Sequence, residues 1–120
     1  MTALQKLIEL EQDARDFGFD WPDAHMVLDQ IIDECREVRE DLLAQSTPEK
    51  IQEEIGDLLH ATISLCLFSG FEVEDTLHKV NHKFAKRMRA LKHITKEEGL
   101  ENLKGKSIDY MLELWKKAKR

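Results

Sequence analysis

One helical pattern occurs twice in this chain of 120 residues, and the second copy begins twenty residues after the first. The first copy consists of Ile31, Glu34, Cys35, Glu37 and Val38, and the second consists of Ile51, Glu54, Ile55, Asp57 and Leu58. Because successive residues of an α-helix lie about 100° apart around its axis, each copy carries an apolar stripe with two carboxylates along one edge. Two such helices that pack antiparallel through their stripes would bring four carboxylates together beside the core.

Helical spacing and capping residues extend over the rest of the chain. Gly18 and Gly70 should end the first and third helices. Thr47 before Pro48 should begin the third helix, and Ser107 should begin the last. We expect helices near residues 3–17, 22–44, 48–69, 72–96 and 108–118. Since neither an alternating strand pattern nor a hairpin turn signal occurs, we predict an all-α fold, an antiparallel bundle of four to five helices in one domain, 1–120.

The later half of the third helix, residues 58–68, is apolar on nearly every side. Three neighbouring helices of this length would not cover so wide an apolar surface. We therefore expect an oligomer, a homodimer or homotetramer, with the third helix in the interface.

The net charge of −6 conceals a strong asymmetry, because residues 1–75 carry −14 and residues 76–120 carry +8. Such a division suits a ligand that is both metal-bound and anionic, or else charge complementarity between packed helices. The overall acidity argues against nucleic-acid binding, and no apolar run is long enough to cross a membrane. Cys35 and Cys66 lie in apolar stretches, so we expect reduced, buried thiols and a cytoplasmic protein without a signal peptide.

The two acid pairs, Glu34 with Glu37 and Glu54 with Asp57, point to a metal site. Like charges three residues apart destabilise a helix by a few tenths of a kcal/mol per pair, and a divalent cation would remove that repulsion. Clusters of oxygen ligands suit hard cations such as Mg²⁺ or Mn²⁺. The alternative is a solvated acidic face paired with neighbouring basic residues.

A basic face follows on the fourth helix, where Lys83 and Arg87 lie four residues apart and Asn81 adds an amide. These side chains could hold phosphate oxygens, with arginine supplying a planar fork. An ordinary solvated basic helix has the same pattern. Trp21, before the second helix, could stack on a nucleobase or pack into the core.

Segments 34–38, 53–59 and 80–84 with Arg87, in this order on long helices, resemble the MazG-type all-α nucleoside triphosphate pyrophosphohydrolases. Residues 19–22 and 112–115 fit the same pattern, so the resemblance extends over nearly the whole chain from about Phe17. The sequence departs from the family at Asp33, where members often have a second glutamate. Only one MazG-like unit is present, whereas some relatives have two.

The resemblance implies Mg²⁺-dependent hydrolysis of a nucleoside or deoxynucleoside triphosphate to the monophosphate and pyrophosphate. Since oxygen ligands also suit Mn²⁺, that ion is a possible substitute. It implies that Asn81, Lys83 and Arg87 contact the phosphate chain. It also implies that Glu53 or one of the metal ligands orients the attacking water. The metal ligands that it implies are Glu34, Glu37, Glu54 and Asp57.

Two other functions compete with this one. The spacings Asp57-x-x-His60 and Asp75-x-x-His78 echo the Glu-x-x-His motif of di-iron carboxylate bundles. His60, however, should face away from the apolar stripe, which weakens that alternative. The second competitor is a non-catalytic helical interaction module whose acidic residues are only solvated.

Overall fold

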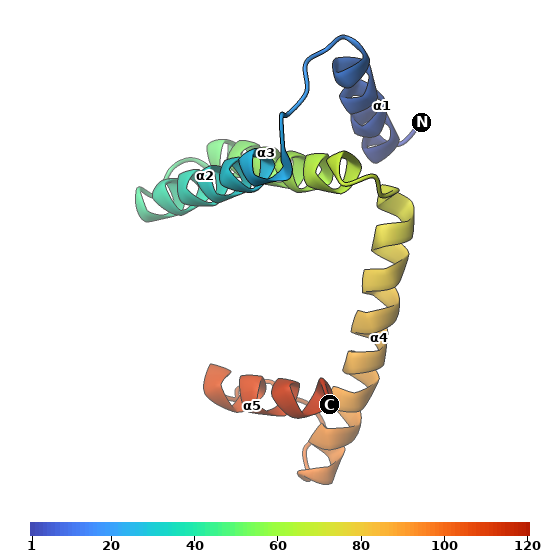
Figure 1. Cartoon of the computed structure of the whole chain (residues 1–120). Helices are drawn as coiled ribbons and strands as arrows, with labels where there is room; N and C mark the ends of the chain where they lie inside the picture. Colours follow the sequence, from blue (N-terminus) through green and yellow to red (C-terminus); the bar gives the residue numbers. More distant parts are fainter. The chain divides into compact units, whose positions relative to one another are not determined.

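The computed structural model describes all residues from Met1 to Arg120 and is helical, without strands (Figure 1). Its helices are α1 (Ala3–Asp16), α2 (Ala24–Leu43), α3 (Pro48–Phe68), α4 (Val73–Glu97) and α5 (Ile108–Ala118). The all-α prediction is confirmed, and the number of helices is the expected five. The chain forms two compact units, residues 1–73 and 74–120. None of the helices combines the length and apolar character needed to span a membrane.

Local hydrogen bonds set the helix boundaries. Thr47 accepts a hydrogen bond from the Lys50 backbone N–H at 3.3 Å and begins α3, with Pro48 in its first turn. Ser107 begins α5 in the same way. The expected start of α2 at Pro22 is wrong by two residues, because the Asp23 carboxylate accepts from the Met26 N–H and caps the helix there.

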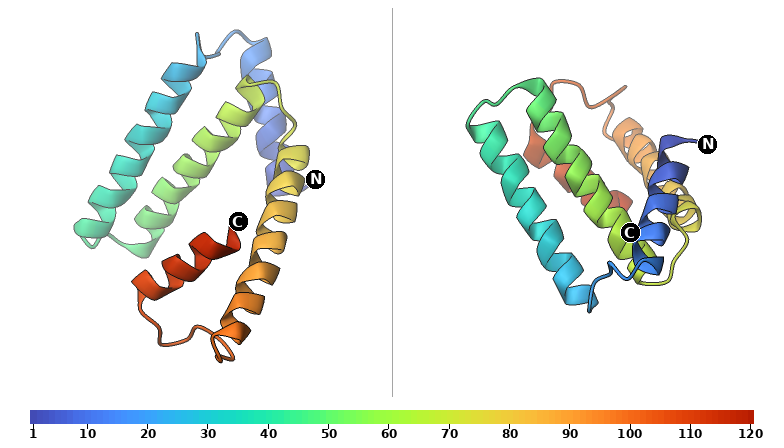
Figure 2. Two further views of the ribbon diagram at one scale, coloured as in Figure 1. Left: turned by 60° about the horizontal axis from the view of Figure 1, so that its bottom comes forward. Right: turned by 90° about the horizontal axis from the view of Figure 1, so that it is seen from above.

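Within the first unit, α2 and α3 form an antiparallel hairpin and pack side by side (Figures 1 and 2). The predicted antiparallel packing is found for this pair, whereas α1 packs on α3 and not on α2, which follows it in sequence. Polar contacts hold α1 there, because Arg15 donates to the Ser64 backbone carbonyl at 3.1 Å. As a result, one cavity is lined by residues of α1, of the connection between α1 and α2, and of both hairpin helices.

The chain buries few large apolar side chains by itself. Val27 of α2 and Leu114 of α5 are fully buried, whereas Leu59 of α3 is 60% exposed. The prediction of buried cysteines is wrong for this chain, since Cys35 is exposed and Cys66 only half-buried. The sequence predicts burial because both cysteines lie in apolar stripes. The stripes of α2 and α3 are wider than the surface that the two helices cover on each other, so these side chains are not fully covered.

In the second unit, α4 and α5 meet through aromatic contacts. The rings of Phe84 and Trp115 have centroids 6.1 Å apart. The Arg87 guanidinium lies 5.9 Å from the Trp115 ring, a cation–π arrangement. The basic face of α4 is therefore held in part by α5.

Candidate metal and nucleotide site

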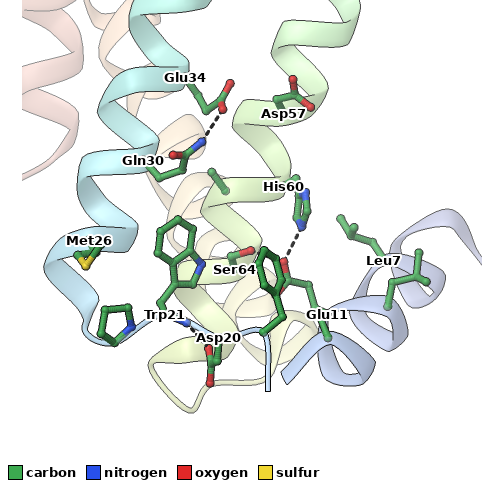
Figure 3. Close-up of a pocket in the computed structure, with 15 residues that line it drawn as sticks. Leu7, Glu11, Asp20, Trp21, Met26, Gln30, Glu34, Asp57, His60 and Ser64 are labelled. Atoms are coloured by element: carbon green, nitrogen blue, oxygen red, sulfur yellow. Dashed lines mark hydrogen bonds and ion pairs between the residues drawn. The ribbon is translucent and has the colours of Figure 1, made fainter. Parts of the chain in front are cut away.

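The register of the hairpin brings three carboxylates from two helices together. Glu34 of α2 and Glu54 and Asp57 of α3 each offer one oxygen, and these oxygens all lie within 4.8 Å of one another. Glu34 is only 8% exposed. Figure 3 shows Glu34 and Asp57 on facing helices at the same level of the hairpin. The repeated acid pattern thus converges where antiparallel packing through the stripes would put it.

Two oxygens of this cluster are buried without a hydrogen-bond partner. Glu34 Oε1 accepts from Gln30 Nε2 at 2.6 Å, but Glu34 Oε2 has no partner, and neither has Glu54 Oε2. A buried carboxylate oxygen without a donor is costly and rare in folded proteins. A hard divalent cation would satisfy both oxygens, so the donor set fits Mg²⁺ or Mn²⁺.

Electrostatics at Glu54 support the same interpretation. Burial raises the pKa of the Glu54 carboxyl above its usual range, and the hydrogen bond and negative charge of Glu37 and the charge of Asp41 raise it further. Lys50, 3.9 Å away, lowers that pKa in part. Glu37 thus lies beside Glu54, although it is exposed and stands outside the group of three. The crowded negative charge would be relieved by a bound cation.

A cavity of about 540 Å³ adjoins the acidic cluster and is lined by residues from α1, α2, α3 and the connection between α1 and α2 (Figure 3). Glu34 and Asp57 belong to its wall. Much of the remaining wall is apolar, with Leu7, Leu10 and Met26 among the lining residues. An apolar cavity with convergent polar groups is the usual form of a small-molecule site.

Trp21 also lines this cavity and is half-buried. The sequence left two roles open for this side chain, base stacking and core packing. Its place in the same wall as Glu34 and Asp57 puts an aromatic ring and the acidic cluster in one pocket.

Sequence reasoning missed a polar group on the α1 side of the pocket. Glu11 accepts hydrogen bonds from His60 Nε2, at 2.5 Å, and from the Ser64 hydroxyl. His60 was expected to face away from the apolar stripe of α3; it meets α1, which packs on α3, and there its side chain lines the cavity while remaining 49% exposed. The sequence contains one signal that Glu11 faces inward, because Glu11 continues the helical spacing of the apolar residues Leu4, Leu7 and Ile8.

The di-iron alternative lacks its histidine ligands. The His60 Nε2 atom bonds to Glu11 and is not part of the oxygen cluster. His78 lies on α4, where it pairs with the exposed Glu74 at 3.4 Å. The cluster is therefore composed of oxygen ligands alone, which favours hard cations over iron sites with imidazole ligands.

The other expected site residues are distributed over both units. Glu53 is exposed on α3, beside Glu54 in sequence. Asn81, Lys83 and Arg87 lie on α4 in the second unit, where Asn81 and Lys83 are exposed. Asp33 pairs with Arg36 at 3.3 Å on the exposed surface of α2.

Comparison with known proteins places the chain in a family. The chain is 35% identical over 124 residues to the nucleoside triphosphate pyrophosphohydrolase of Escherichia coli (strain K12). It is 32% identical over 119 residues to the nucleoside triphosphate pyrophosphohydrolase/pyrophosphatase MazG of Thermotoga maritima. These matches cover 100% and 99% of this chain but 46% and 45% of the relatives, so the chain spans about half of their length. Residues 23–92 match the MazG nucleotide pyrophosphohydrolase domain, and the chain belongs to that family.

Proposed function

We propose that this chain hydrolyses nucleoside triphosphates to the monophosphate and pyrophosphate in a reaction that requires Mg²⁺. The observation that carries the proposal is the cluster of Glu34, Glu54 and Asp57. Glu34 and Asp57 line the cavity, and Glu34 and Glu54 each have a buried oxygen without a partner. Membership of the MazG domain family supports it. The names of the E. coli and T. maritima relatives support the choice of substrate.

In this proposal the cation is held by four carboxylates, Glu34, Glu37, Glu54 and Asp57. When bound, it supplies positive charge that neutralises phosphate oxygens during phosphoryl transfer. Mn²⁺ would serve in place of Mg²⁺, since both accept sets of oxygen ligands. Glu37 lies beside Glu54 and is exposed. This position suits a metal ligand that also reaches the substrate.

The remaining roles fall to side chains outside the cluster. Glu53 would orient the attacking water, since a carboxylate can accept a proton from water within hydrogen-bond reach. Asn81, Lys83 and Arg87 would contact the phosphate chain, with Lys83 and Arg87 stabilising the leaving pyrophosphate. The chain has no Gly-rich Walker loop that would cradle the β- and γ-phosphates, which favours cleavage between the α- and β-phosphates.

The nucleoside part of the substrate would enter the cavity beside Trp21. Aromatic side chains bind bases through stacking, which contributes about 1–3 kcal/mol per base. The apolar wall formed by Leu7, Leu10 and Met26 suits the face of a base. The triphosphate, which is carried by the sugar of the same nucleotide, would then extend toward Glu34 and Asp57 in the same wall.

Assembly as a homodimer or homotetramer belongs to the same proposal. Leu28, Ile32 and Leu59 are large, exposed apolar side chains on the hairpin. Exposed apolar patches of this kind often mark protein–protein interfaces. A second copy of the chain packed on the hairpin, with α3 in the interface, would cover them.

The test is a panel of nucleoside and deoxynucleoside triphosphates incubated with Mg²⁺, with pyrophosphate and orthophosphate resolved by chromatography. We expect pyrophosphate and the monophosphate from at least one nucleotide, and loss of both products in Asp57→Asn. Asp109→Asn, which changes an acidic residue in the first turn of α5, is the matched control. Absence of Mg²⁺-dependent products from every nucleotide would contradict the proposal.

A further inference from the structure

Arg15 connects α1 to α3 through residues that line the pocket. Its side chain is only 20% exposed. Its Nη2 donates to the backbone carbonyl of Ser64 at 3.1 Å and lies 3.8 Å from Glu11 Oε2. Its guanidinium carbon lies 6.0 Å from the centre of the Phe68 ring. The Arg15 guanidinium therefore joins α1 to α3. Two of the residues that it contacts, Glu11 and Ser64, also line the cavity.

The same guanidinium also reaches the connection between α1 and α2. Arg15 Nε lies 3.6 Å from Asp20 Oδ1, and this oxygen accepts a hydrogen bond from the backbone N–H of Trp21 at 2.7 Å. Arg15 Nε is buried and makes no hydrogen bond, so Asp20 provides its compensating charge. Through a single oxygen atom, Arg15 is linked to the backbone of the aromatic residue in the pocket wall.

We propose that Arg15 is a positioning residue that fixes Trp21 relative to α3 and so shapes the pocket for the nucleoside part of the substrate. This inference rests on the function proposed above. The planar guanidinium fork can address Ser64, Glu11 and Asp20 at once, whereas a lysine ammonium is a compact charge without that geometry. Arginine is therefore the side chain that suits this position.

The arrangement of the helices separates this role from metal binding. Glu34, Glu54 and Asp57 lie on α2 and α3, which pack directly on each other. Arg15 contacts α3 at Ser64 and Phe68, away from these carboxylates in sequence. Loosening the Arg15 contacts should therefore alter the Trp21 side of the pocket while the acidic cluster keeps its geometry.

Steady-state kinetics of Arg15→Gln and Arg15→Lys test the proposal. We expect KM for the nucleoside triphosphate to rise about tenfold, as for a weakened base-stacking contact, with kcat unchanged. Inhibition by inorganic tripolyphosphate, which has no nucleoside, should be unchanged. Lys6→Gln is the matched control, because Lys6 is an exposed cation of α1 that pairs only with Glu9, at 3.8 Å. A fall in kcat at unchanged KM, or weaker inhibition by tripolyphosphate, would overturn the proposal.

A second measurement does not depend on activity. Trp115→Phe leaves Trp21 as the only tryptophan of the chain, so its quenching by acrylamide reports on the exposure of that ring. In this background, Arg15→Gln should increase quenching. Asp20→Asn should do so more weakly, since the amide oxygen can still accept from the Trp21 N–H. The effects of the two changes should be less than additive, because they remove one interaction.

The outcomes also separate this proposal from the function on which it rests. If the unaltered protein hydrolyses no nucleotide, the proposed function fails, whereas the quenching experiment still decides whether Arg15 orders Trp21. If hydrolysis occurs but Trp21 quenching is the same with and without Arg15, the positioning role is overturned and the function stands. Should Arg15→Gln not fold, Asp20→Asn carries both measurements.

Discussion

The buried carboxylate of Glu34 on α2 and the carboxylate of Asp57 on α3 hold oxygens within 4.8 Å of each other, in the wall of the same cavity. Without a cation, two negatively charged carboxylates lie close together, and water has little access to one of them, Glu34. Such an arrangement is unfavourable in isolation. A bound divalent cation would offset this repulsion.

Millimolar Mg²⁺ should raise the melting temperature of the protein, because a ligand that binds only the native state stabilises it. At a concentration 100 times its Kd, this amounts to about 2.7 kcal/mol. Glu34→Gln should reduce the Mg²⁺-dependent rise, since it removes a buried ligand. Differential scanning fluorimetry with and without Mg²⁺ provides the measurement. Asp29→Asn, an exposed acid on the same helix, should respond like the unaltered protein. Equal responses in Glu34→Gln and Asp29→Asn would contradict the assignment.

The raised pKa of Glu54 predicts a pH dependence of stability in the absence of metal. Across the interval between the unfolded and the raised folded pKa, the native state binds more protons than the unfolded state. The contribution of Glu54 to the free energy of unfolding therefore falls as pH rises through this interval. Glu54→Gln removes this contribution, so its stability should decline less steeply with pH than that of the unaltered protein.

Denaturant unfolding in EDTA over the acidic pH range, for both proteins, measures this difference. Added Mg²⁺ should oppose the decline in the unaltered protein, because the cation competes with protons for the same oxygens. Parallel pH profiles for the two proteins would show that Glu54 has no such role.

Lys83→Ala should reduce turnover by about 10²-fold, the usual effect of losing a group that stabilises developing charge. The Mg²⁺-dependent rise in melting temperature should remain, because lysine is not a metal ligand. Single-turnover kinetics and thermal melting distinguish the two effects. Lys92→Ala is the control, since Lys92 is an exposed cation of the same helix. If both lysine variants lose the same activity, a specific role for Lys83 is wrong.

Light scattering should give a mass of at least twice the 14.0 kDa of the chain at micromolar concentration. Leu59→Glu should dissociate the assembly, because the predicted interface includes α3 and a buried charge there would be unpaired. Leu112→Glu, at a comparably exposed leucine of α5, should leave the assembly intact. A monomeric mass for the unaltered protein would refute the predicted oligomer.

Features that depend on local hydrogen bonds or on one helix pair were accessible from the sequence. Thr47 and Ser107 cap α3 and α5 as expected, since the capping oxygen and its N–H partner are three residues apart. The meeting of Glu34 with Glu54 and Asp57 followed from two stripes packed antiparallel through a short turn.

Other features depend on tertiary packing that no periodicity specifies. The Glu11–His60 contact exists because α1 packs on α3, and the spacing within α1 does not name its partner helix. The exposure of Cys35 arises similarly, because an apolar stripe indicates what can be buried but not what is available to cover it. The pocket wall around Trp21 depends both on which helix α1 packs against and on which side chains cover the apolar residues there.

Product analysis with α-labelled and γ-labelled nucleoside triphosphates identifies which phosphoanhydride bond the protein cleaves. With Mg²⁺, the α-label should appear in the nucleoside monophosphate and the γ-label in pyrophosphate, and Asp57→Asn should form neither product. Release of the γ-label as orthophosphate, with the α-label in the nucleoside diphosphate, would contradict cleavage between the α- and β-phosphates.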